Sequence, residues 1–285
     1  MDYYSKLVCP ICKTNLETKS KTLKCEKCKV SYPIVDNIPI FISPEEQKKW
    51  NDYHIEEYTP LLQNPKREDF KLDIVIGEES YSSAPFTEED YYGRYIDDWK
   101  TMLDVGCGDG IFSAPMSNKV EDIYCVDPSF ISLKRLLKRE RQNMYPINAD
   151  GGHLPFPNDF FDGVFFIFVL EHLKDPLPIL SEIKRVLKPT GHLILSTDSK
   201  YYYRYFRILT ELIRYRHYRP DDPTHVNLMT PNEVRNIIDN AGFITEKEYL
   251  RYFPQRLYKY YKIVPKFISE PFLTSIIIHK CHPQK

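Results

Sequence analysis

Three glycines at alternate positions, directly after an aliphatic run, constrain this chain more than any other feature. Residues 103–110 read Leu-Asp-Val-Gly-Cys-Gly-Asp-Gly, and a helix-compatible stretch, residues 111–118, follows. We therefore predict a strand, a tight turn and the N-terminus of a helix. Glycine lets the backbone adopt positive φ and approach a ligand closely, and the free N–H groups of a helix start face that ligand. An ordinary strand-to-helix turn would show the same pattern in isolation.

The spacing of the glycines separates this turn from the turn of dinucleotide-binding enzymes. It is G-x-G-x-G here, whereas those enzymes use G-x-G-x-x-G. Asp104 lies two positions before the first glycine. A carboxylate at that point suits a ligand with an amino group better than a pyrophosphate, because like charges repel.

Strand-like and helix-like segments alternate from about residue 91 onward. Seven segments are predicted as strands: 102–106, 123–127, 144–148, 164–168, 192–198, 244–249 and 275–281. Helical patterns separate the first six, and residues 188–191 are predicted as a turn that ends a helix. Alternation of this kind is typical of βαβ units, so we expect an α/β fold with a doubly wound, seven-stranded, mostly parallel sheet. The last strand is expected to form a terminal hairpin.

Together these features resemble the class I S-adenosylmethionine-dependent methyltransferases. The glycine turn is similar to their motif I, and residues 154–164, 169–173 and 187–193 match later motifs of that family in order. The resemblance implies a Rossmann-like sheet and S-adenosylmethionine as the cofactor. It places these residues at the cofactor: Asp104, Gly106, Gly108, Asp127, Asp150 and Phe168.

Two of these acids have specific roles in the resemblance, and each has a simpler alternative. Asp127 ends the second predicted strand, where a carboxylate can accept hydrogen bonds from both ribose hydroxyls. The alternative is a cap for a helix that begins near Ser129. Asp150 follows the third predicted strand, where the family places an acid that hydrogen-bonds the adenine amino group. The alternative there is a turn-forming aspartate.

Four of the seven cysteines form two C-x-x-C pairs near the N-terminus: Cys9, Cys12, Cys25 and Cys28. Four thiolates can close a tetrahedron around one ion, and a site of four cysteines with no open position is the structural form of zinc site. Residues 31–42 are predicted as a strand, a turn at Asp36-Asn37 and a second strand. With the cysteines, this run resembles the zinc ribbon of the small activator subunits of tRNA and protein methyltransferases. We expect a zinc ribbon at residues 1–42, fused in cis, which could also bind a protein partner.

Residues 43–90 are predicted as a linker with one helix that begins at Ser43-Pro44. The formal net charge is −1, so no global field draws the chain to nucleic acid or to a membrane, and any such contact would be local. The N-terminus lacks a basic region followed by an apolar one, and no apolar run is long enough for a membrane span. We expect a cytoplasmic protein.

The remaining candidates lie on the expected substrate side of a methyltransferase domain at residues 91–285. His172 follows the fourth predicted strand, at the edge where ligands of open α/β sheets collect, and is a candidate general base. A structural role is the alternative. A lid insertion is predicted at residues 201–227, with an amphipathic helix whose polar face carries three arginines: Arg204, Arg207 and Arg214.

Three interpretations of this basic insertion stay open. It could be a lid with solvated arginines, a site for an anionic substrate such as a phosphate-bearing sugar, lipid carrier or nucleotide, or an RNA-binding surface. The segment after the fourth strand lacks an Asn/Asp-Pro-Pro-Tyr motif, which argues against amino-directed DNA and protein methyltransferases. We expect a methyltransferase acting on an oxygen or nitrogen acceptor. The alternatives are an RNA methyltransferase and a non-catalytic module that binds the cofactor or recruits a partner.

Overall fold

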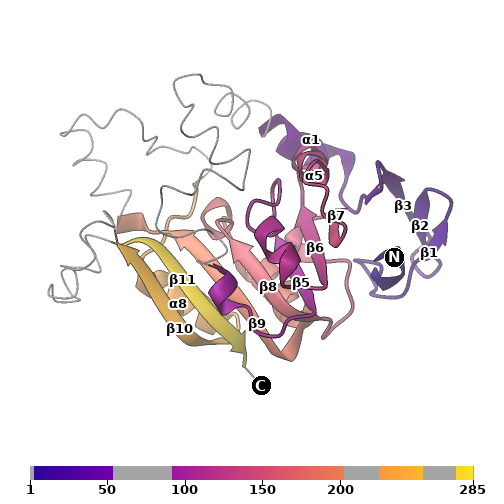
Figure 1. The fold of residues 1–285 in the computed structure, drawn as a ribbon. Coiled ribbons are helices and arrows are strands. Elements are labelled where there is room, and N and C mark those ends of the chain that lie inside the picture. Colours follow the sequence, from indigo (N-terminus) through magenta and orange to yellow (C-terminus); the bar gives the residue numbers. More distant parts are fainter. Residues whose placement is uncertain (1–2, 54–91, 202–224, 253–273, 285) are drawn as a thin grey trace, which may run out of the picture.

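The computed structural model describes residues 3–53, 92–201, 225–252 and 274–284, which form a small antiparallel sheet and a larger mixed one (Figure 1). The small sheet follows a 3-10 helix, η1 (Tyr3–Lys6), and has four strands in chain order. These are β1 (Glu17–Lys19), β2 (Thr22–Cys25), β3 (Val30–Val35) and β4 (Ile38–Pro39). Asp36 and Asn37 join β3 to β4 with φ of 51° and 63°, as a two-residue hairpin turn requires. The predicted strand, turn and strand are confirmed.

The large sheet has seven strands in the order β10-β11-β9-β8-β5-β6-β7. Their bounds are β5 (Thr101–Val105), β6 (Asp122–Asp127), β7 (Met144–Asn148), β8 (Phe161–Ile167), β9 (Leu187–Asp198), β10 (Phe243–Tyr252) and β11 (Thr274–Pro283). Every neighbouring pair is parallel except those made by β11, which runs antiparallel to both β9 and β10. The predicted mostly parallel sheet with a terminal hairpin is confirmed.

Four α-helices are described: α1 (Pro44–Tyr53), α5 (Phe130–Leu137), α6 (Leu177–Val186) and α8 (Pro231–Asn240). Reciprocal hydrogen bonds between Ser43 and Glu46 begin α1, and Thr230 and Glu233 form the same capping box at α8. The helix start predicted at Ser43-Pro44 is therefore confirmed.

Two predicted helical connections are wrong in kind. Residues 111–118 form turns and a short 3-10 helix, η6 (Ala114–Asn118), because Pro115 cannot donate to a helical ladder and the Ser113 side chain does not cap the segment. Between β7 and β8 the structure has only η7 (Gly151–His153). The turn predicted at residues 188–191 is also wrong, because β9 starts directly after α6.

Both faces of the large sheet are buried. Along β8, Val164 and Phe166 belong to one apolar cluster, and Phe165 and Ile167 belong to the cluster on the other face. These four consecutive residues can therefore all be apolar, which is typical of a sheet covered on both sides. Among the described residues, no helix is long and apolar enough to cross a membrane.

The small N-terminal sheet lies against the edge strand β7 (Figure 1). The Phe41 N–H donates to the Asn148 carbonyl at 2.7 Å, and the Tyr3 ring stacks on Tyr145 with centroids 4.8 Å apart. Leu7, which follows η1, and Leu23 of β2 belong to the same buried cluster as the core of the large sheet. The two sheets thus share one core, and the N-terminal unit covers a strand edge that would otherwise expose backbone groups.

Candidate functional site

The glycine turn after β5 is hydrogen-bonded to β6 at its first glycine and has open space beside its second. Gly106, Gly108 and Gly110 have φ of 75°, 54° and 78°, a region that favours glycine. The N–H of Gly106 donates to the Val126 carbonyl at 2.8 Å, which fixes the turn to β6. A Cβ at Gly106 would overlap Val169, whereas a Cβ at Gly108 would meet no described atom within 4 Å. Gly108 is therefore the point where a ligand can approach the backbone.

Asp104 lies on β5 beneath this turn and is buried. Its Oδ2 accepts a short hydrogen bond from the Ser113 hydroxyl. Burial raises the pKa of Asp104 to about 7, although the Ser113 hydroxyl opposes the rise. A cationic group of a ligand would restore the ionised form, because it would supply the opposite charge that the buried site lacks.

Asp127 ends β6 and holds the glycine turn to the start of α5. Its Oδ2 accepts from the Gly108 N–H at 2.8 Å, and its Oδ1 accepts from the Ser129 N–H at 2.7 Å. Burial raises the pKa of Asp127 to about 6. The contact with Ser129, the N-cap of α5, corresponds to the helix-start alternative. Each carboxylate oxygen has a second lone pair, so ribose binding remains a prediction.

Asp150 and Phe168 follow the carboxyl ends of β7 and β8, at the same edge of the sheet as Asp104 and Asp127. Asp150 comes after β7 with its side chain about half exposed, and its Oδ2 lies 3.2 Å from His153 Nδ1. The strand predicted to reach Phe168 stops at Ile167, and Phe168 has a φ of 55°. An aromatic residue in that region is strained, and such strain collects at functional sites. The Phe168 ring packs 5.6 Å from that of Phe112.

The candidate base His172 has two neighbours that sequence patterns did not single out. It lies on η8 (Leu170–His172) directly after β8, and its ring centroid is 4.9 Å from that of His225. Glu171 is buried, and its Oε2 accepts from the Thr197 hydroxyl at 2.8 Å. Burial raises the pKa of Glu171 to about 8. No local sequence pattern connects His225 to this pair, because His225 lies far from Glu171 and His172 along the chain.

The arginines of the predicted insertion, Arg204, Arg207 and Arg214, lie outside the described residues, as does most of the 201–227 segment and of the 43–90 linker. Their predicted roles stay predictions.

The four paired cysteines come together in the N-terminal unit. Their sulfur atoms all lie within 4.8 Å of one another, with Cys9 and Cys28 at 4.0 Å and Cys12 and Cys25 at 3.5 Å. A tetrahedral zinc site with Zn–S bonds of about 2.3 Å has sulfur atoms about 3.8 Å apart. The four thiols therefore fit one zinc ion.

The ionisation of these thiols also fits a cation. Hydrogen bonds with Thr14 lower the pKa of Cys12 to about 6, whereas a hydrogen bond with Cys12 raises the pKa of Cys28 to about 12. Crowded thiols oppose one another's ionisation in this way. A divalent ion removes the conflict, because every thiolate then faces a positive charge.

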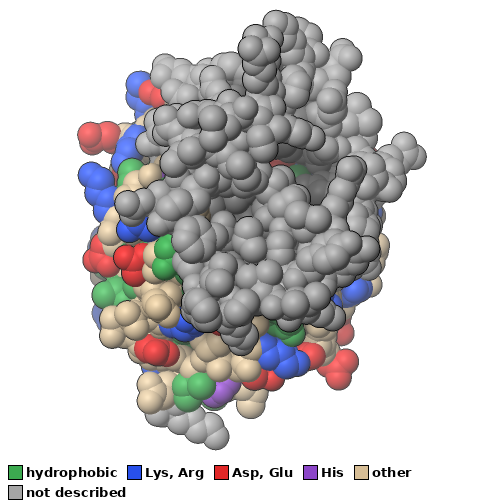
Figure 2. All heavy atoms as spheres, turned by 90° about the vertical axis from the view of Figure 1, so that its left-hand side faces the viewer, with side chains coloured by type: hydrophobic (Ala, Val, Ile, Leu, Met, Phe, Trp, Pro, Cys, Tyr) green, Lys and Arg blue, Asp and Glu red, His purple; other side chains and the backbone are tan. Residues whose placement is uncertain are grey.

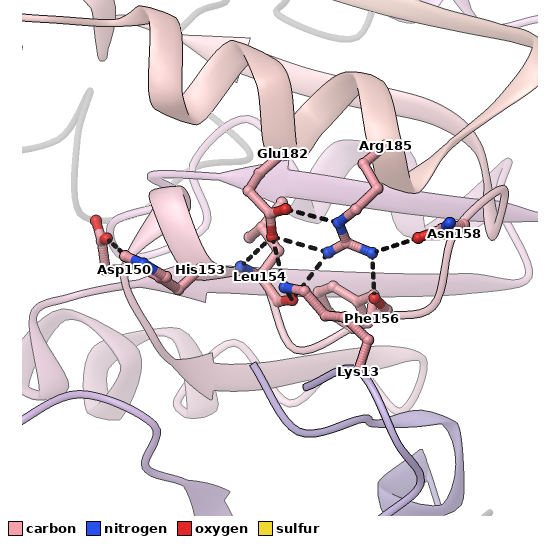
Figure 3. Close-up of polar contacts among 8 residues, drawn as sticks. All are labelled: Lys13, Asp150, His153, Leu154, Phe156, Asn158, Glu182 and Arg185. Carbon is pink, nitrogen blue, oxygen red and sulfur yellow. Dashed lines mark hydrogen bonds and ion pairs between the residues drawn. The ribbon is translucent and has the colours of Figure 1, made fainter. Parts of the chain in front are cut away.

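A polar network connects the first cysteine pair to the loop that carries Asp150 (Figure 3). Lys13, directly after Cys12, places its Nζ 2.9 Å from Glu182 Oε2 and 3.2 Å from the Leu154 carbonyl. Glu182 also accepts from the Leu154 N–H at 2.9 Å, and Arg185 donates to Glu182 and to three groups of the same loop. The metal-binding unit thus contacts the loop between β7 and β8.

Comparisons with known proteins agree with this arrangement. The methyltransferase domain model matches residues 81–248, and the Trm112p-like protein model matches residues 6–37. A ubiquinone biosynthesis O-methyltransferase of Cereibacter sphaeroides is 29% identical over 202 residues, which cover 68% of this chain and 76% of the relative. A tRNA U34 carboxymethyltransferase of Marinobacter nauticus is 31% identical over 143 residues, which cover 41% of this chain and 42% of the relative. Several curated relatives are matched over only about half of their own length.

Among solved structures, the complex between the Haloferax volcanii Trm112 methyltransferase activator and a methyltransferase has a matching chain with a TM-score of 0.52. Its sequence identity is 15%, and the match covers 80% of this chain and 98% of that one, so the likeness concerns the fold. The chain therefore belongs to the methyltransferase domain family, whose methyl donor is S-adenosylmethionine, and it carries a Trm112-like zinc ribbon near its N-terminus.

Proposed function

We propose that this protein transfers the methyl group of S-adenosylmethionine to an oxygen atom of a small acceptor, as the name of its ubiquinone biosynthesis O-methyltransferase relative suggests. The observation that carries the proposal is the open backbone at Gly108, flanked by the buried carboxyls of Asp104 and Asp127 at the ends of adjacent parallel strands. Ligands of open α/β sheets bind at this edge. This edge would take a ligand that carries both a cationic amino acid end and a ribose.

The roles of the cofactor residues follow from their chemistry. Asp104 would accept from the ammonium group, since burial raises the pKa of its carboxyl to about 7 and a nearby cation would favour the ionised form. Gly106 and Gly108 would give the backbone room for the cofactor, and Asp127 would accept from the ribose hydroxyls. Asp150 would accept from the adenine amino group, and Phe168 would supply an apolar wall.

The transfer itself needs little from the protein beyond orientation. When bound, S-adenosylmethionine would supply an electrophilic methyl group. The acceptor oxygen would take this group, the electron pair of the carbon–sulfur bond would stay on sulfur, and the acceptor proton would pass to a base or to water. Holding the nucleophile in line at short range can contribute roughly 7–11 kcal/mol of the barrier. His172 stands at the edge where an acceptor would lie and is the candidate base.

RNA is the second candidate acceptor. A tRNA-modifying relative and the Trm112-like ribbon favour it. Figure 2 shows basic and acidic side chains interspersed over the described part of one face of the molecule. RNA binding would therefore depend on a more local basic surface, such as the predicted insertion with Arg204, Arg207 and Arg214. An anionic small substrate would use the same arginines.

The ribbon in this proposal serves its own catalytic domain, because its contacts are with β7 and with the loop that follows. A further protein or RNA partner would use its opposite face. We place the protein in the cytoplasm, since none of the cysteines is in a disulfide and four of them fit a zinc site, a use of cysteine that is typical of reducing compartments.

The proposal is tested on the zinc-loaded full chain in two steps. Calorimetry with S-adenosylmethionine and with its demethylated product should show binding, and the absence of heat with both would overturn the cofactor assignment. Transfer of a labelled methyl group to a fractionated cell extract should then label small molecules. Label in the RNA fraction would establish the second candidate instead, and binding without transfer to any fraction would establish a non-catalytic module.

A further inference from the structure

Two histidines and a glutamate meet beside the proposed cofactor site. Glu171 and His172 are consecutive on η8, and His225 comes from the segment that precedes α8. One potential ligand atom of each residue lies within 4.8 Å of the other two. Asn227 holds the second segment in place, because its N–H donates to the Glu171 carbonyl at 3.0 Å and its side-chain amide donates to the Leu173 carbonyl at 2.9 Å.

Glu171 has an oxygen that the described protein leaves without a hydrogen bond. The residue is 1% exposed, its Oε2 is engaged by Thr197, and its Oε1 has no hydrogen-bond partner among the described residues. An unsatisfied carboxylate oxygen in the interior is costly, and buried charges are generally paired or bound to metal. Within the described part of the chain, Glu171 thus offers a buried acceptor oxygen next to two imidazoles.

We propose that Glu171, His172 and His225 bind a divalent transition-metal ion such as Mn²⁺, Fe²⁺ or Zn²⁺. Two imidazoles and one carboxylate are the donors that such ions take, and three protein ligands leave coordination positions open. Binding would draw the three donor atoms from their present spacing to about 2.0–2.2 Å from the ion. The site differs in kind from the four thiolates of the ribbon, which close their ion completely.

The position of η8 gives this ion a task, and that part of the inference rests on the proposed function. Val169, next to η8, packs directly against Gly106 of the cofactor turn. An acceptor hydroxyl bound at an open position of the ion would have its pKa lowered and would lose its proton to water. The metal-bound oxygen would then be the nucleophile for the methyl carbon. His172 would act as a ligand in this arrangement, not as a free base.

Mn²⁺ is the suitable probe, because it prefers nitrogen and oxygen donors over the ribbon thiolates and is detected directly by electron paramagnetic resonance. We expect zinc-loaded full-length protein to bind one Mn²⁺ ion, with hyperfine coupling from imidazole nitrogen. Glu171→Gln and His225→Gln should lose this ion while they retain their zinc and their binding of S-adenosylmethionine. His282→Gln, at the end of β11 in the sheet, is the matched control and should bind Mn²⁺ as the wild type does.

The outcomes separate this inference from the proposed function. Wild-type protein that binds S-adenosylmethionine but no Mn²⁺, or Mn²⁺ without nitrogen coupling, overturns the metal site and leaves His172 as the candidate base. Wild-type protein that binds Mn²⁺ with nitrogen coupling but no cofactor supports the metal site and overturns the methyl-transfer function. The nitrogen coupling needs no variant, so the inference stays testable if a substitution prevents folding.

Discussion

The carboxyl of Asp104 illustrates how a single residue can favour ligand binding at the cost of stability. It is buried, and its nearest described donor is one hydroxyl, that of Ser113. A raised pKa means that the ionised form is held in the fold without adequate compensation. A buried carboxyl without a counter-charge is expected where a ligand supplies the missing positive charge.

Asp104→Asn should therefore stabilise the folded protein and lower its affinity for the cofactor. The unfolded chain loses the Asp104 proton near pH 4, whereas the folded chain keeps it up to about pH 7, so the wild type loses stability between these values. The asparagine variant has no such loss, and its melting temperature should exceed that of the wild type increasingly from pH 4 to pH 7. Melting curves across this range and calorimetry with S-adenosylmethionine check both effects. An equal difference in melting temperature at every pH would contradict the explanation.

Two glycines of the same turn should respond differently to alanine. Gly106→Ala places a methyl group against Val169 and should lose stability, on the order of 1–3 kcal/mol, through overpacking and strain. The added methyl group of Gly108→Ala meets no described atom, so the variant should lose only about 1–2 kcal/mol of stability, from its positive φ. It should lose most of its affinity for the cofactor, because the methyl group would occupy the space where the ligand approaches. Denaturant unfolding and cofactor titration of the pair measure this. Unchanged cofactor affinity in Gly108→Ala would show that the open side of the turn is not the ligand side.

At the scale of elements, the two cysteine turns have the same local geometry and different surroundings. Lys13 and Lys29 each follow the second cysteine of a pair, with φ of 57° and 58°. The Lys13 side chain is partly buried against Glu182, whereas that of Lys29 is 78% exposed beside Glu26. The two turns have similar local geometry, but Lys13 contacts Glu182 of α6 and the Leu154 carbonyl, whereas the described ion pair of Lys29 is with Glu26 of the ribbon itself.

Lys13→Met should lower both the stability of the protein and its affinity for the cofactor. Lys29→Met is the matched control. Removing Lys13 leaves Glu182 with Arg185 and frees part of the loop after Asp150, so we expect a loss of about 1 kcal/mol and a weaker hold on the cofactor adenine. Lys29→Met should stay within about 0.5 kcal/mol of the wild type, as exposed ion pairs do. Unfolding curves and cofactor titration test this. Equal effects of the two substitutions would mean that the network does not reach the cofactor loop.

At the scale of the whole molecule, the ribbon and the large sheet share one core. Leu7 and Leu23 pack in the same buried cluster as the strands of the sheet, and Phe41 extends the backbone hydrogen bonds of β7. Units joined in this way are expected to unfold together, because neither buries its apolar surface alone.

Removal of zinc should therefore destabilise the entire chain. Cys25→Ser, or a chelator strong enough to strip the ion, should lower the melting temperature in one transition seen by both far-UV and aromatic signals, and should lower cofactor affinity. Differential scanning calorimetry with zinc analysis is the measurement. Two separate transitions, with the second unchanged from the zinc-loaded protein, would show that the ribbon folds apart from the sheet.

Local pattern was sufficient for much of this molecule. The seven strands, the glycine turn, the hairpin at Asp36-Asn37 and the four cysteines could all be predicted, because each depends on the side-chain period or on residues a few positions apart. The pattern failed at residues 111–118 and 188–191, where one proline and the pairing of β9 with β8 outweighed it.

Tertiary structure alone decided which distant residues meet. His225 joins Glu171 and His172 because the segment before α8 is hydrogen-bonded to η8, and the ribbon covers the edge of β7 because apolar side chains of both units close over one core. Such contacts join residues far apart in the chain, and no periodicity in a single sequence encodes them. The sequence by itself thus determined the family and predicted which sheet edge would bind the cofactor, while the fold determined where the ribbon packs and which residues cluster beside the glycine turn.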